Sequence, residues 1–401
     1  MSHKFDIIFL PLYRDIGDVI VSEIYWTLNT LEFTAENYRT QTYVGRISQT
    51  GLEHIGKLSD NVSSYNIDSN RTVTSDFLFY ISILRSGLKN IFSAKIWHHY
   101  GSFGYMKGFN PAFLLPKFGK KYVLGPILYP TNDPPDTAVR LGFIQKQHYY
   151  GKFAVLIFRL LHILTLLRSD VIIFDSYTTK NIYTSQFPFI KKKVGKIIPG
   201  GGISQKDFYM DITTTKHENI ILGVASNLIK RKNIDKLIEA VASSELNISL
   251  KIAGDGPERE NLMSLVEKFG LNGKVIFIGR IDHSAMRHFY NSIDIYVALD
   301  NVPSEAKISL QEAMMCGCAV ISGETDVKNF VVKKEWGLVV NPVSISDIGR
   351  AINLICNNPQ DLLKIKINAK RYADELFSTN TILKRYQDIF NDLISDSGRF
   401  A

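Results

Sequence analysis

Short apolar runs alternate with helical patterns along the whole chain. Each run is about as long as a buried strand, and amphipathic or polar stretches separate the runs. This alternation predicts parallel sheets with helices on both faces, which is the α/β class. The runs that we interpret as strands are Phe5 to Leu10, Lys95 to Trp97, Tyr122 to Leu124, Val171 to Phe174, Lys196 to Ile198, Ile220 to Val224, Ser249 to Ala253, Val275 to Ile278, Ile295 to Ala298, Ala319 to Ile321 and Leu338 to Val340.

The chain of 401 residues is long enough for two domains of about 200 residues each. The polar interval 213–218 is the predicted linker between them. We expect one domain over residues 1–212, a second over 219–375, and a terminal helix over 376–401 that returns to the first domain. Two doubly wound domains of this kind bind ligands at the carboxyl ends of their strands, in a cleft between the domains.

Charge is distributed unevenly between the two halves. Residues 1–212 hold 24 Lys plus Arg against 16 Asp plus Glu, whereas the remainder holds 23 of each. An anionic partner is therefore expected for the first half: a phosphorylated substrate, anionic lipid or nucleic acid. No nucleic-acid reading motif is found, which argues against the last of these.

The segment 147–168 has an apolar run that Arg159 and His162 interrupt. The run is shorter than the roughly 20 residues that a bilayer span requires. Two interpretations stay open: a partly buried domain helix, or a helix face on a membrane surface beside anionic lipid. The N-terminus lacks the pattern of a signal peptide, and three cysteines are too few for a disulfide framework, so a reducing cytosol is expected.

The stretch PSEAKISLQEAMMCG, residues 303–317, contains a predicted helix start. Ser309 and Glu312 have the spacing of a capping box, and Gly317 can end the helix in a left-handed conformation. The polar run 304–307 stands directly before this cap. The free N–H groups of a helix N-terminus can bind an anion there.

The order of motifs in the second half resembles that of the retaining GT-B glycosyltransferases of family 4, the glycosyl transferases group 1. The resemblance implies two Rossmann-like domains facing across a cleft. It also implies a UDP- or GDP-sugar donor bound by the second domain and an acceptor bound by the first. The motifs that carry the resemblance are DKLIEAV, GDGPE, VIFIGR, LQEAMMCGCAVI and EWGLVV, with weaker similarity in RSDVIIFDSYTTKN and KIIPGGGI.

On the donor side, the resemblance places a phosphate-binding Arg and Lys at Asn227 and Lys232, so only the lysine is kept. A cation there stabilises the leaving diphosphate, whose negative charge grows in the transition state. Lys230 and Arg231 are candidates to replace the missing charge. The resemblance further implies that Arg280 lies near the base, that Glu312 holds the ribose, and that the helix start at Ile308 and Ser309 faces phosphate.

The family's first glutamate would fall at Ser304, one position before Glu305. Ser304 and Glu305 are accordingly the candidates for the catalytic sugar subsite, together with Lys307 as a donor-binding cation. On the acceptor or sugar side the candidates are Gly17, His98 and His99. Gly125-Pro126 occupies the place of a family histidine that contacts the sugar. The chain has no Asp-x-Asp pair, so we expect neither a metal nor a cofactor.

The predicted function is that of a metal-independent, retaining glycosyltransferase of surface polysaccharide or glycolipid biosynthesis. Its expected partners are a nucleotide sugar, a glycan or lipid-linked acceptor and an anionic membrane surface, at the inner face of a cell membrane. The alternative is a degenerate GT-B protein that binds nucleotide or a partner glycosyltransferase without catalysis. The departures at Asn227, Ser304 and Gly125 favour this alternative.

Overall fold

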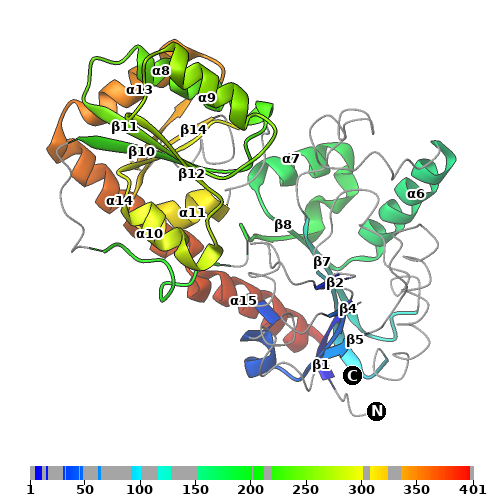
Figure 1. The fold of residues 1–401 in the computed structure, drawn as a ribbon. Helices are drawn as coiled ribbons and strands as arrows, with labels where there is room; N and C mark the ends of the chain where they lie inside the picture. Colours follow the sequence, from blue (N-terminus) through cyan, green and yellow to red (C-terminus); the bar gives the residue numbers. More distant parts are fainter. Residues whose placement is uncertain are drawn as a thin grey trace. The chain divides into compact units, whose positions relative to one another are not determined.

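Two parallel sheets organise the chain, one in each of two units, in this computed structural model (Figure 1). The first unit comprises residues 1–202 and 382–401, and the second comprises 203–381. The chain thus changes units earlier than the polar interval 213–218. The structure describes residues 5–10, 15–16, 30–31, 33–44, 46–47, 62–64, 92–100, 116–127, 152–200, 202–211, 219–300, 308–323 and 336–397.

The sheet of the first unit has the strand order β5-β3-β1-β6-β7-β8-β9, and every pair in it is parallel. The order reverses between β1 and β6, which is the signature of a doubly wound sheet. Its strands are β1 (Phe5–Leu10), β3 (Thr40–Val44), β5 (Val62–Ser64), β6 (Ala94–His99), β7 (Lys121–Ile127), β8 (Val171–Phe174) and β9 (Val194–Ile197), and β2 (Asp15–Ile16) pairs with β4 (Arg46–Ile47) beside it.

The last helix, α15 (Thr379–Ser397), supplies much of the core of the first unit. Its residues Ile382, Tyr386 and Phe390 are fully buried in a cluster with residues of β1 and β6. The other helices of this unit in the described residues include α6 (Lys152–Arg168), α7 (Tyr177–Gln186) and the short η3 (Pro188–Lys193).

The sheet of the second unit has the order β12-β11-β10-β13-β14-β15 and is also wholly parallel. It reverses between β10 and β13, so the expectation of doubly wound α/β units is confirmed for both sheets. The strands are β10 (Ile220–Ala225), β11 (Ile248–Ala253), β12 (Val275–Gly279), β13 (Ile295–Ala298), β14 (Ala319–Gly323) and β15 (Gly337–Val340).

Helices cover both faces of this second sheet (Figure 1). Successive strand residues point to opposite faces, so Leu222 and Val224 enter one apolar cluster while Ile221 enters the other. Burial on both faces explains why the strands appear in the sequence as continuous apolar runs. The helices are α8 (Ile234–Ala242), α9 (Arg259–Lys268), α10 (Met286–Asn291), α11 (Ile308–Met315), α13 (Ile345–Cys356) and α14 (Pro359–Phe377), with short turns η4 (Lys230–Lys232) and η5 (His283–Ala285).

Candidate functional site

A small pocket lined by both apolar and polar residues lies at the carboxyl ends of β10 and β13, where the strand order of the second sheet reverses. This switch point is where doubly wound sheets bind their ligands. The pocket holds about 30 Å³, enough for a few atoms such as the oxygens of a phosphate. Its walls are formed by Val224, Ala225, Ser226, Lys232, Ile234, Leu237, Tyr296, Val297, Ala298, Leu299, Asp300 and Ser309.

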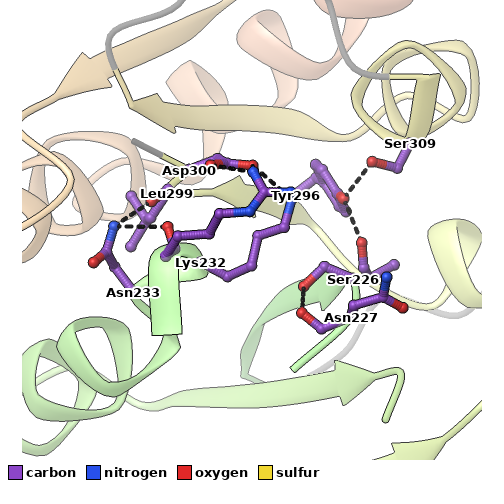
Figure 2. A network of polar contacts seen from close by, with 10 residues as sticks. Ser226, Asn227, Lys232, Asn233, Tyr296, Leu299, Asp300 and Ser309 are labelled. Atoms are coloured by element: carbon purple, nitrogen blue, oxygen red, sulfur yellow. Dashed lines mark hydrogen bonds and ion pairs between the residues drawn. The ribbon is translucent and has the colours of Figure 1, made fainter. Parts of the chain in front are cut away.

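Two cations, the pocket residue Lys232 and its neighbour Arg231, meet one buried carboxylate, that of Asp300. Figure 2 shows Lys232 beside Asp300. The Lys232 Nζ donates to Asp300 Oδ2 at 2.6 Å, and Arg231 Nη1 lies 2.9 and 2.8 Å from the two carboxylate oxygens. The Asp300 side chain is only 3% exposed, whereas those of Arg231 and Lys232 are 19% and 18% exposed. Two cations against one carboxylate leave one net positive charge for a ligand.

The loop that carries these cations is fixed at both of its ends. Asn233 adopts a left-handed conformation with φ 49°, and its Nδ2 donates to the Leu299 carbonyl at 2.6 Å. At the other end Gly254 approaches so closely that a Cβ there would lie 1.9 Å from the Ser226 carbonyl oxygen. Only glycine at position 254 therefore allows the GDGPE turn to pack this closely against the loop after β10.

Two buried tyrosines hold the first turns of α11 against the sheet. The Tyr296 hydroxyl donates to the Ala225 carbonyl at 3.1 Å and lies 2.8 Å from the Ser309 hydroxyl. The Tyr290 hydroxyl donates to Glu312 Oε2 at 2.9 Å. Burial raises the pKa of both phenols, so both stay protonated near neutral pH. Figure 2 shows Tyr296 between Ser309 and the loop after β10.

Glu312 is not the capping residue that its spacing predicted. Helix α11 begins at Ile308, which places Ser309 inside the first turn. The buried Glu312 carboxylate instead contacts His283 Nε2 at 2.8 Å and accepts from Tyr290, because a buried carboxylate requires polar partners on both oxygens. The hydrogen bond that the His283 ring donates to the Glu312 carboxylate raises the pKa of the imidazole. Gly317 does end the helix, with φ 79°.

The remaining predicted donor residues either do not line the pocket or lie outside the described residues. Asn227 is exposed on the loop after β10, and Arg280 is exposed at the end of β12. Neither forms a wall of the pocket. Ile308 is half-buried at the start of α11. Outside the described residues lie Gly17, Ser304, Glu305 and Lys307.

His98 and His99 are enclosed in the first unit and present almost no surface to a ligand. The His98 ring packs against Phe9 and Tyr100, and its Nε2 lies 2.9 Å from the Gly125 carbonyl oxygen. Burial lowers the pKa of both imidazoles to about 3, so both are neutral at physiological pH. Gly125 has φ 120°, and a Cβ there would lie 2.2 Å from the Ile173 carbonyl oxygen.

The structure adds Asp300, Tyr296 and His283 to the residues that the sequence pointed to. The motif DIYVALD did carry one signal, since an acid directly after a buried strand often marks the ligand edge of a parallel sheet. In the part of the chain that the structure describes, no group of three or more His, Cys, Asp or Glu side chains could hold a metal.

Comparison with solved structures identifies the fold of the chain. A sucrose-phosphate synthase from Thermosynechococcus elongatus superimposes with a TM-score of 0.70 at 16% identity, over 98% of this chain and 100% of that one. The Anabaena protein Alr3699/HepE, solved in complex with UDP, superimposes with a TM-score of 0.68 at 15% identity, over 96% and 100%. The chain therefore has the GT-B glycosyltransferase fold.

Residues 205–372 match the family model for glycosyl transferases group 1. An uncharacterized glycosyltransferase of Methanocaldococcus jannaschii is 27% identical over 196 residues, 48% of this chain and 50% of that protein. The phosphatidylinositol N-acetylglucosaminyltransferase GPI3 subunit of Saccharomyces cerevisiae is 23% identical over 206 residues, 50% and 43% of the two chains. The O-antigen biosynthesis glycosyltransferase WclY of Escherichia coli is 23% identical over 182 residues, 45% and 48%. The matches span about half the length of these relatives.

The Asp300→Ala substitution is expected to lower the free energy of unfolding of the second unit by about 1 to 3 kcal/mol, because it leaves two partly buried cations side by side without their carboxylate. Chemical denaturation measures the change. The matched control is Arg350→Ala, which removes half of an exposed ion pair with Asp347 in the same unit and should cost less than about 1 kcal/mol. Equal losses in the two variants would contradict the structural role of Asp300.

The His283 imidazole is expected to titrate above its usual pKa of 6.5, and Glu312→Gln should lower that pKa. A raised pKa in the folded state means that the pair stabilises the fold fully below pH 6.5 and less as pH rises through the folded pKa. NMR titration of the ring protons measures the shift. Glu267→Gln, on α9, is the control and should leave the titration unchanged. An unaltered His283 pKa in Glu312→Gln would show that the pair does not form.

Proposed function

We propose that this protein transfers a sugar from a UDP- or GDP-sugar donor to a glycan or lipid-linked acceptor, with retention of the anomeric configuration and without a metal. The observation that carries the proposal is the convergence of Arg231 and Lys232 with three hydroxyl groups at the switch point of the second sheet. The group 1 domain at residues 205–372 supports it. So does the complex of HepE with UDP.

The diphosphate of the donor is proposed to bind Lys232 and Arg231. An ammonium has three donors and a guanidinium has five, so both cations keep donors for phosphate while they contact Asp300. Arg231 then supplies the charge that the family has at the position of Asn227. Negative charge grows on the diphosphate as the sugar leaves, so these cations stabilise the transition state more than the ground state.

The nucleoside is proposed to bind beside the first turn of α11. Glu312 and His283 form one hydrogen-bonded pair, and Arg280 lies three residues before His283 on the same loop. This arrangement supports Glu312 as the ribose-binding residue, with His283 fixing its carboxylate. Ser304, Glu305 and Lys307 directly precede α11 in the sequence and remain our candidates for the sugar subsite.

The reaction is proposed to proceed by attack of the acceptor hydroxyl on the face from which the diphosphate leaves. The bond from the anomeric carbon to the phosphate oxygen breaks, a bond to the acceptor oxygen forms, and the acceptor proton passes to the leaving phosphate oxygen. The names of the WclY and GPI3 relatives support an acceptor in surface polysaccharide or glycolipid assembly. On the acceptor side, Gly17 remains a candidate. His98 and His99 are enclosed, so they would affect acceptor binding only by supporting the packing of the first unit.

A second candidate function is nucleotide binding without transfer. The contact of Asp300 with both phosphate-site cations favours it, because this carboxylate competes with phosphate for the same donors. The serine at position 304, where the family has its first glutamate, favours it as well. Such a protein would act through a partner glycosyltransferase.

Calorimetric titration with UDP and GDP is expected to show binding that Lys232→Ala and Arg231→Ala each weaken about tenfold, because each removes a charge-assisted hydrogen bond to phosphate. The matched control is Lys230→Ala, which removes an exposed cation from the same triplet and should change affinity by less than about twofold. Thermal unfolding of each variant identifies any folding defect.

Equal weakening by Lys230→Ala and Lys232→Ala would show that the phosphate site is misassigned. Wild-type protein that binds no nucleotide would contradict both candidate functions. Turnover of a UDP- or GDP-sugar with an extract of lipid-linked acceptors decides between them, because the second candidate predicts binding with no transfer.

A further inference from the structure

Helix α6 exposes a stripe of leucines on the first unit. Leu156, Leu160, Leu164 and Leu167 are 53%, 54%, 41% and 48% exposed, and their spacing places them on one face of the helix. The opposite face is buried through residues such as His162 and Leu166. The buried face fits the interpretation of a partly buried domain helix, and the exposed face is the one that the membrane-surface interpretation concerns.

The segment that carries this stripe is basic, and Arg159 on α6 itself is exposed. Residues 152–200 contain eight Lys or Arg and only two Asp. Asp175 is buried, and Asp170 pairs with Lys117 at 2.8 Å, so neither acid offsets the exposed cations of this segment. Any partner of this surface must therefore tolerate or require positive charge.

The short helix η3 extends the surface at the C-terminal end of α6. The Lys193 Nζ donates to the Leu166 carbonyl at 3.3 Å and to the Leu167 carbonyl, which holds η3 against α6. Lys191 and Lys192 are exposed on η3, and Phe189 is 43% exposed beside them. We call this combination of the α6 leucine stripe with Phe189, Lys191 and Lys192 the α6–η3 surface.

We propose that the α6–η3 surface binds an anionic lipid bilayer, with the leucines in the acyl boundary and the lysines at the headgroups. The proposal names a membrane partner for the proposed transferase. Lipid binding itself does not depend on the transferase function, and only its biological purpose rests on that function. A bilayer accepts both an apolar stripe and adjacent cations, and each lysine near an anionic leaflet adds to the binding.

The composition of the surface favours lipid over a protein partner. Protein interfaces are depleted in lysine, and leucine is uncommon among the residues that dominate their binding energy. In the described residues no helix is long and apolar enough to cross a membrane. Helix α6 itself has 17 residues with a buried face, so it is expected to lie in the plane of the interface.

Vesicle sedimentation tests the proposal with phosphatidylcholine alone and with a mixture of phosphatidylcholine and phosphatidylglycerol. The full chain is expected to bind the mixed vesicles and to dissociate as salt is raised. The triple variant Leu156→Ser, Leu160→Ser, Leu164→Ser should lower the partition coefficient at least about tenfold. The double variant Lys191→Gln, Lys192→Gln should lower it about tenfold as well.

The matched control is Leu354→Ser with Leu363→Ser, which removes two leucines that are 63% and 51% exposed on the second unit. This variant should bind vesicles like the wild type. The proposal is overturned if the wild type binds neither vesicle, or if the α6 variants bind like the wild type. It is also overturned if the leucines instead bury a dimer contact, seen as a loss of dimer in the triple variant with no vesicle binding.

Nucleotide titration of the same proteins separates this proposal from the transferase function. If the protein binds UDP or GDP but not vesicles, only the proposal for the α6–η3 surface is contradicted. If the protein binds vesicles but no nucleotide, only the transferase proposal is contradicted. Thermal unfolding of every variant shows whether a loss of binding reflects a loss of fold.

Discussion

The contact of one buried carboxylate with two cations is the constraint on which the candidate site depends. Arg231 and Lys232 are adjacent and only partly exposed, so their like charges would repel without Asp300 between them. Asp300 follows β13 and the cations follow β10, so the ion pairs join two strand ends. The same contact leaves a single net positive charge beside the pocket, where we propose that the donor diphosphate binds.

The parallel sheet is what makes this contact possible. Reversal of strand order between β10 and β13 separates the loops that leave their carboxyl ends, and a pocket forms between those loops. Two tyrosine hydroxyls then fix the start of α11 at its edge. The buried hydrogen bonds hold the polar groups of the site in position before any ligand binds, which lowers the cost of ordering them.

The two units use their apolar residues differently. In the second unit the helices cover both faces of the sheet and bury its strands. In the first unit α6 buries one face and exposes leucines on the other, in a basic segment of the chain. An uncovered apolar stripe of this kind is costly in water unless a partner covers it. Our two proposals thus place donor binding on the second unit and membrane contact on the first.

The sequence by itself determined the α/β class and the positions of eleven of the thirteen strands in the two sheets, because periodicity is a local property of the chain. The strands Thr40–Val44 and Val62–Ser64 were not recognised from the sequence. Tertiary structure decided which distant groups meet. The partner of Lys232 proved to be Asp300, and Glu312 turned to His283 and Tyr290 instead of capping its helix. His98 became part of a core while Leu160 became surface. These outcomes depend on strand order and helix orientation, which bring together residues that no local pattern connects.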